Sequence, residues 1–158
     1  MNVRFERYLE TLTKSKRDIA CEAVSEYLKG DAEDVSKFVT ASAVYTYCRS
    51  HAMYQEEHSW VLLLKANYSL IKEVELCSGT VKGTMFDVQA ILREALFSKA
   101  QGVIMVHNHP SGSITPSRED NEITITVQKA CDLLNIKLTD HVIICNGNYY
   151  SYAEEGKL

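Results

Sequence analysis

Apolar runs and helical spacing alternate along the chain after residue 55, and this order restricts the fold more than any other feature. Two apolar runs joined around Asn67 are typical of a β-hairpin, and Asn146-Gly147 marks a second tight turn. The expected elements are a hairpin over 60–80, a helix over 86–100, a strand over 102–108, a helix over 118–134, and strands over 141–145 and 149–153. This order predicts an α/β (α+β) layered domain in which helices flank a mixed β-sheet.

The first 54 residues differ, because their apolar residues recur at steps of three to five. Such spacing is typical of short amphipathic helices, with a break at Gly30 and a further helix over 34–51. At 158 residues the chain is long enough for one domain with a real core. We therefore expect a helical N-terminal segment over 1–54 and one domain over 55–158.

The charge balance gives no support to nucleic acid as a partner. The formal net charge is −4, and lysines and arginines are scattered except for a short run at Lys14, Lys16 and Arg17. That run is typical of a solvated helix end. Because no extended basic stripe is available to neutralise phosphates, we do not expect specific nucleic-acid binding.

Neither a membrane nor an oxidising compartment is indicated. The N-terminus has no apolar stretch resembling a signal peptide, and no later segment approaches the roughly 20 apolar residues that span a bilayer. The five cysteines are odd in number and form no CxxC pair, which predicts neither a disulfide framework nor a cysteine zinc site. We expect a cytoplasmic protein with no membrane partner.

The segment VHNHPSGSITPSRED, residues 106–120, carries the candidate chemistry. Side chains alternate along a strand, so His107 and His109 point the same way and Asn108 points away. Ser117 then begins a helix whose first turn contains Asp120. Two imidazoles and one carboxylate are ligands that a catalytic zinc uses when it keeps its fourth position for water. The segment predicts an open zinc site.

A purely structural interpretation of the same residues is also open. The histidines could pack near a turn, and Ser117 with Asp120 resembles a capping box at the start of a helix. Capping does not explain why the helix follows a His-x-His-Pro-Ser-Gly turn, so the joint pattern favours metal. A general base is also required, and Glu56 and Glu57 precede the first strand, where charged residues are otherwise simply solvated.

Residues 55–158 resemble the RadC-like proteins, whose domain belongs to the JAMM group of zinc metallopeptidases, which includes deubiquitinating enzymes. The resemblance rests on four stretches: Glu57, HNHPSG at 107–112, PSRED at 116–120 and DHVIIC at 140–145. It implies the layered fold that JAMM and cytidine-deaminase-like domains share. It also implies a zinc-dependent hydrolase that cleaves peptide or isopeptide bonds in a protein or peptide substrate.

The resemblance assigns a role to each residue of the motif. His107, His109 and Asp120 become the Zn²⁺ ligands, with water in the fourth position. Ser117 becomes the hydroxyl that steadies the oxyanion. Glu57 becomes the general base in preference to Glu56, because the family's glutamate stands shortly before a hydrophobic run.

Two departures from the family pattern bear on function. The family's Pro-Arg-Glu ahead of the central helix is replaced by Asp87-Val88-Gln89, so substrate contacts differ. The N-terminal part lacks the Gly-hydrophobic-Gly turn of a helix-hairpin-helix, which weakens any DNA role. Asp140-His141 could be a further acid/base pair, but a structural histidine is the better interpretation of its place at a strand start.

Other functions were weighed against this one. Neither a His-Glu-x-x-His helix nor the zinc deaminase signature occurs in the sequence. A DNA-repair or mobile-element accessory protein, and a zinc-stabilised interaction module without turnover, both remain open. The sequence does not fix the oligomeric state.

Overall fold

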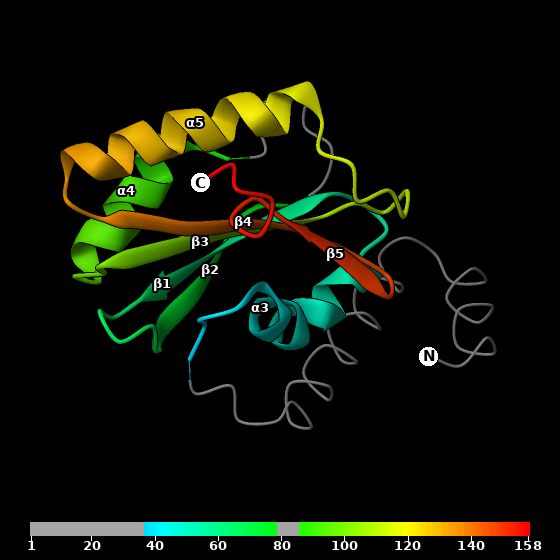
Figure 1. Cartoon of the computed structure of the whole chain (residues 1–158), viewed down its shortest axis with the longest axis horizontal. Helices are drawn as coiled ribbons and strands as arrows, with labels where there is room; N and C mark the ends of the chain where they lie inside the picture. Colours follow the sequence, from blue (N-terminus) through cyan, green and yellow to red (C-terminus); the bar gives the residue numbers. More distant parts are fainter. Residues whose placement is uncertain (1–36, 79–85) are drawn as a thin grey trace.

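The computed structural model describes residues 37–78 and 86–158, and within them a mixed five-stranded sheet with helices on both faces (Figure 1). The strands are β1 (His58–Leu64), β2 (Leu70–Ser78), β3 (Gly102–Asn108), β4 (Lys137–Cys145) and β5 (Asn148–Ser151). The helices are α3 (Ala41–Cys48), the 3₁₀ helix η1 (Arg49–Met53), α4 (Val88–Phe97) and α5 (Arg118–Leu133). The predicted mixed α+β class is confirmed.

The sheet has the order β2-β1-β3-β4-β5, in which β3 and β4 are parallel and the other neighbours are antiparallel. The helix α5 connects the parallel pair, as parallel strands require a crossover. The end of β3 and the start of α5 therefore meet at one edge of the sheet. The segment 106–120 lies at this junction.

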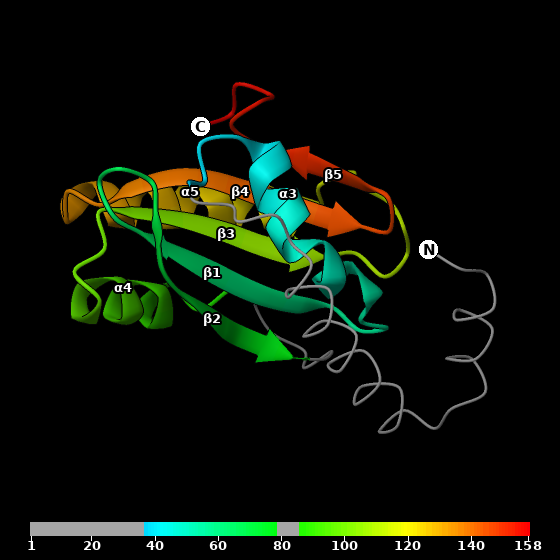
Figure 2. The same ribbon diagram turned by 90° about the horizontal axis from the view of Figure 1, so that it is seen from below.

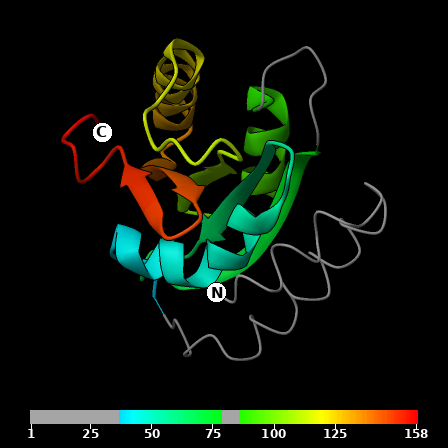
Figure 3. The same ribbon diagram turned by 90° about the vertical axis from the view of Figure 1, so that its right-hand side faces the viewer.

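Three layers account for the uninterrupted apolar runs of the central strands. Figures 2 and 3 show α4 and α5 on one face of the sheet and α3 on the other. Along β1, Val61 and Leu63 pack with α4 and α5, whereas Leu62 and Leu64 pack with α3. A strand covered on both faces is apolar at successive positions instead of alternate ones.

Several boundaries differ from expectation, and those of β4 and α3 are instructive. β4 begins at Lys137, four residues before the expected start at 141, because Leu138 and the buried Asp140 also belong to the strand. The helix expected over 34–51 ends as α3 at Cys48 and continues as η1. The helices expected before residue 37 lie outside the described residues.

Part of the expected N-terminal segment packs directly on the sheet. Phe38, Val44 and Cys48 are buried in one cluster with Leu62 of β1. The division at residue 54 stays a prediction. Within residues 37–78 and 86–158, no helix combines the length and apolar character needed to cross a membrane.

Candidate metal centre

His107, His109 and Asp120 converge at the junction of β3 and α5. Nε2 of His107 lies 3.0 Å from Nε2 of His109 and 3.3 Å from Oδ1 of Asp120. Nε2 of His109 lies 3.7 Å from Oδ2 of Asp120. One ligand atom from each residue lies within 4.8 Å of the others, so the three could hold a metal ion. The spacing in the sequence predicted this convergence.

The ring of His109 is oriented by a backbone group. Its Nδ1 lies 2.7 Å from the carbonyl oxygen of Ser113. A carbonyl only accepts, so Nδ1 carries the proton and donates, which leaves the lone pair on Nε2. That lone pair faces Nε2 of His107. Two ring nitrogens at this separation need a shared proton or a cation between them, and this donor set fits a metal ion.

Asp120 also caps its own helix. Oγ of Ser117 accepts from the backbone N–H of Asp120 at 3.0 Å, and Oδ2 of Asp120 accepts from the backbone N–H of Ser117 at 2.8 Å. Meanwhile Oδ1 of Asp120 faces His107. The capping interpretation and the ligand geometry therefore coexist in one carboxylate, since its two oxygens point to different partners.

The electrostatics of the cluster favour a positive charge at its centre. Burial acts to raise the pKa of Asp120, but hydrogen bonds with His107, His109 and Ser117 outweigh it and hold the pKa well below its usual range. Burial acts to lower the pKa of His109, and the Asp120 carboxylate together with the Ser113 carbonyl reverses the effect, so this pKa is raised. An ionised carboxylate thus faces an imidazole that takes up a proton more readily than a free one does.

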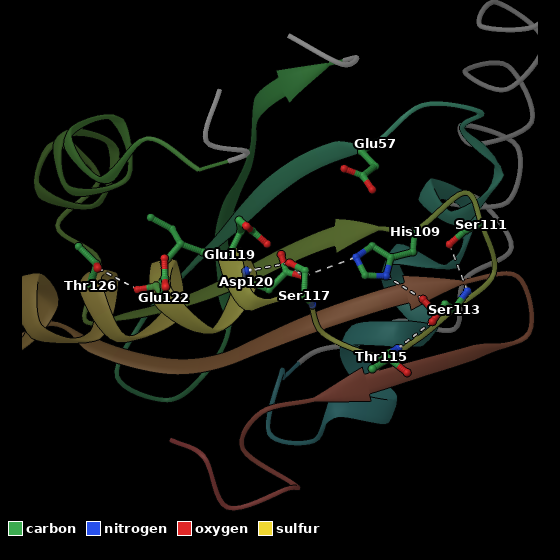
Figure 4. Close-up of a pocket in the computed structure, with 11 residues that line it drawn as sticks. Glu57, His109, Ser111, Ser113, Thr115, Ser117, Glu119, Asp120, Glu122 and Thr126 are labelled. Atoms are coloured by element: carbon green, nitrogen blue, oxygen red, sulfur yellow. Dashed lines mark hydrogen bonds and ion pairs between the residues drawn. The ribbon is translucent and has the colours of Figure 1, made fainter. Parts of the chain in front are cut away.

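The cluster opens onto a cleft of about 760 Å³ (Figure 4). His109, Asp120 and Ile123 line it together with carboxylates and hydroxyls. The remaining lining residues are Glu57, Glu119, Glu122, Ser111, Ser113, Thr115, Ser117 and Thr126. The predicted base Glu57 and the predicted oxyanion donor Ser117 therefore share one cleft with two of the three predicted ligands. Figure 4 shows the Glu57 carboxylate facing His109 from the loop before β1.

Asn108 ties that loop to the strand that carries the histidines. Its side-chain amide is fully buried and donates to the carbonyls of Tyr54 at 3.2 Å and Glu56 at 2.9 Å. Its Oδ1 accepts from the backbone N–H of His58 at 2.7 Å. The backbone is thus held on both sides of Glu57. The sequence placed Asn108 on the opposite face from the histidines, but it did not indicate what that side chain would hold.

His141 lies behind His107 and is fully buried. Burial, and then the neighbouring charge of His107, lowers the pKa of His141 well below its usual range. Asp140 contacts the backbone N–H of His141 and the hydroxyl of Ser151, and not the imidazole ring. The two residues therefore do not form an acid/base pair, in line with the structural interpretation.

Asp87 begins α4 as its N-cap, because its carboxylate accepts from the backbone N–H of Gln89 at 2.9 Å. The segment that replaces the family's Pro-Arg-Glu is therefore a helix start. It is not among the residues that line the cleft. A difference in substrate contacts stays a prediction.

Comparison with known proteins agrees with the motif. The model of the RadC-like JAB domain matches residues 38–157. A UPF0758 protein of Thermotoga maritima is 38% identical over 122 residues, which cover 77% of this chain and 55% of that protein. A UPF0758 protein of Porphyromonas gingivalis is 43% identical over 104 residues, 65% of this chain and 46% of that protein.

A UPF0758 protein of Chlorobaculum tepidum is 31% identical over 156 residues, which cover 99% of this chain and 60% of that protein. The chain thus spans about half the length of the curated relatives that it matches. The family model covers most of the chain, and the motif that it shares with the family forms the cluster at the end of β3. The chain therefore belongs to the RadC-like JAB domain family.

Proposed function

We propose that this chain is a zinc-dependent hydrolase of the JAMM metallopeptidase type, which cleaves peptide or isopeptide bonds. The observation that carries the proposal is the cluster of His107, His109 and Asp120 opening onto a cleft that also contains Glu57. Three ligands with an open side leave room for a water and a substrate carbonyl. A carboxylate outside the ligand set is the group that such chemistry needs as a base.

Each residue has a defined task in the proposed reaction. Zinc, when held by the two Nε2 atoms and the Asp120 carboxylate, supplies Lewis acidity and lowers the pKa of water. Glu57 accepts the proton of the attacking water and delivers it to the leaving amine. The Ser117 hydroxyl donates to the oxyanion that develops on the carbonyl oxygen. The end of β3 and the start of α5 carry the two histidines, Ser117 and Asp120, whereas the loop before β1 carries Glu57.

The chemistry of the cleft supports a peptide in preference to a nucleic acid. Of the described residues that line it, Glu57, Glu119 and Glu122 carry carboxylates in addition to Asp120, and none is a lysine or arginine. Arg118, on the exposed start of α5, pairs with Glu122 at 2.8 Å. Carboxylates repel phosphates, whereas they leave a neutral or cationic peptide free to enter.

The experiment is metal analysis followed by a cleavage screen. The untagged chain is reconstituted with zinc, and its metal content is measured before it is incubated with a library of linear and isopeptide-linked peptides. The proposal requires about one zinc per chain, cleavage of at least one substrate class, and loss of that cleavage in Glu57→Gln. Bound zinc with no cleavage of either linear or isopeptide-linked peptides would instead indicate an interaction module. Submicromolar duplex DNA binding at physiological salt would favour the accessory-protein function.

A further inference from the structure

A chain of buried polar contacts runs from His107 away from the cleft. Nδ1 of His107 lies 2.9 Å from Nε2 of His141, and Nδ1 of His141 lies 2.6 Å from Oγ1 of Thr124. The Thr124 hydroxyl lies 2.5 Å from the backbone carbonyl of Asp120. His107, His141 and Thr124 are each at most 2% exposed. The chain of contacts therefore begins and ends at residues of the candidate metal centre.

The last acceptor fixes the direction of every hydrogen bond in this chain. The carbonyl of Asp120 can only accept, so the Thr124 hydroxyl donates to it. The Thr124 oxygen is then the acceptor for Nδ1–H of His141, and a neutral imidazole that donates from Nδ1 has its lone pair on Nε2. His107 must therefore donate from Nδ1, which leaves the lone pair on its own Nε2.

The surroundings of His141 hold the ring in this orientation. Tyr152 stacks on it at a centroid distance of 4.8 Å, and Phe86 meets it edge-on at 5.2 Å. The only nearby carboxylate on its own strand, Asp140, accepts from Ser151 and from backbone N–H groups. Neither ring nitrogen of His141 therefore has a described side-chain partner other than His107 and Thr124.

We propose that His141 and Thr124 are positioning residues that fix the tautomer of His107, so that its Nε2 presents a lone pair to the metal. His109 achieves the same result with a single backbone carbonyl. Without Thr124, the proton of His141 could move to Nε2, and His107 would then hold its own proton on Nε2 and lose its ligand atom. The inference concerns metal affinity, and it holds whether or not the bound metal cleaves a substrate.

The decisive variant is Thr124→Val, which keeps the volume of the side chain and removes the hydroxyl. Zinc affinity, measured by competition with a chelator, should fall by about 10–100-fold, the usual effect of removing a group that orients a metal ligand. The matched control is Thr46→Val. Thr46 donates to the carbonyl of Ser42 at 2.8 Å, the same bond one helical turn back, on the remote helix α3. Its zinc affinity should not change.

Two variants of His141 separate the effect of its hydrogen-bond acceptor on zinc affinity from the effect of its aromatic ring. His141→Gln keeps an oxygen that can accept from Nδ1–H of His107, whereas His141→Phe keeps an aromatic ring without an acceptor. The expected order of zinc affinity is wild type, then Gln, then Phe. Equal affinities for Gln and Phe would contradict the proposal. If the Phe variant does not fold, Thr124→Val still decides.

The tautomer is also directly observable in the metal-free chain. Imidazole ¹⁵N signals at mildly alkaline pH should show His107 protonated at Nδ1 in wild type, and a shift toward Nε2 protonation in Thr124→Val. A His107 ring already protonated at Nε2 in wild type would overturn the inference. This readout needs neither zinc nor substrate. A failed cleavage screen therefore tests the proposed function alone, and the ¹⁵N result tests the tautomer alone.

Discussion

The hydroxyl of Ser117 lies 2.6 Å from Oδ2 of Asp120 and donates to it. The residue that begins α5 therefore holds the carboxylate of the proposed ligand as well as capping the helix. Its proton points at Asp120 in the absence of a substrate. Donation to a substrate oxyanion then requires the hydroxyl to rotate and to give up this charge-assisted hydrogen bond.

Ser117→Ala should lower the free energy of unfolding of the metal-free chain by about 1 kcal/mol, as expected for loss of an N-cap. Ser117→Asn, which restores a good cap without a hydroxyl, should recover most of that stability. Both variants should cleave substrate more slowly than wild type. Urea denaturation and steady-state kinetics give the two readouts. Full activity in the Asn variant would show that the hydroxyl only caps α5.

Removal of either histidine should abolish stoichiometric zinc. His107→Ala and His109→Ala each leave two ligands, too few for a stable site, and elemental analysis of the reconstituted chain measures the loss. Asp120→Asn should bind zinc more weakly while it keeps part of the cap, because the amide oxygen can still accept. Unchanged zinc affinity in Asp120→Asn would limit that residue to its capping role.

Glu57→Gln should keep the fold and the zinc but lose cleavage by a factor of about 10²–10⁴, the usual contribution of a general base. Glu56→Gln is the matched control, because Glu56 is not among the residues that line the cleft. Its activity should stay near that of wild type. If the two effects are reversed, Glu56 is the base. Loss of zinc from Glu57→Gln would make Glu57 a ligand.

Asn108→Ala should lower the free energy of unfolding by about 3 kcal/mol, because it removes three hydrogen bonds of a buried side chain, two to the carbonyls of Tyr54 and Glu56 and one from the backbone N–H of His58. It should also slow cleavage through the displaced Glu57. The control is Asn148→Ala, whose side chain lies exposed at the start of β5 and accepts from its neighbour. Equal stability of the two variants would show that the loop before β1 does not depend on Asn108.

Asp140 gives the fold a pH dependence that a single variant can isolate. Burial raises the pKa of Asp140 above its ordinary value of 3.8, against the hydrogen bonds from Ser151, Ala153 and His141. The native state therefore holds the proton more tightly than the unfolded chain. The stabilisation that this bound proton gives to the native state is complete below the ordinary pKa of aspartate. It is lost as the pH rises through the raised pKa of Asp140. The free energy of unfolding of Asp140→Asn should not show this decline with rising pH.

Denaturant unfolding at several pH values checks the difference between wild type and Asp140→Asn. The stability advantage of wild type should shrink as the pH rises above the ordinary aspartate range. An advantage that grows with pH instead would mean that the native structure favours the ionised carboxylate. The comparison cancels the other titrating groups, since both proteins contain them.

The candidate ligand cluster could be predicted because it is local. His107 lies near the end of β3, His109 follows directly after that strand, and Asp120 occupies the first turn of the next helix, so short sequence spacing brings all three together. The strand β4 was harder to delimit, because the buried Asp140 breaks its apolar pattern. Polar burial of this kind depends on partners such as Ser151 that no local pattern identifies.

The contacts behind the ligands could not be predicted, because they depend on register. His141 meets His107 because β3 and β4 pair with His107 opposite Ile143, two residues along the strand from His141. Likewise the loop before β1 meets Asn108 because Ser59 pairs with His107. The periodicity of a single strand determines neither pairing register. In the sequence, only its spacing from Asp120 on the same helix could have indicated a role for Thr124.

The proposed base and the proposed ligands arise from different parts of the chain. The proposed ligands occupy residues 107–120, whereas Glu57 lies on the loop before β1, which the contacts of Asn108 hold. Under the proposed function, a substitution near residue 57 should therefore leave a chain that binds metal without turnover, while the segment over 107–120 is inherited unchanged. Related chains that keep both histidines should accordingly divide into enzymes and inactive binders by the residue at this one remote position.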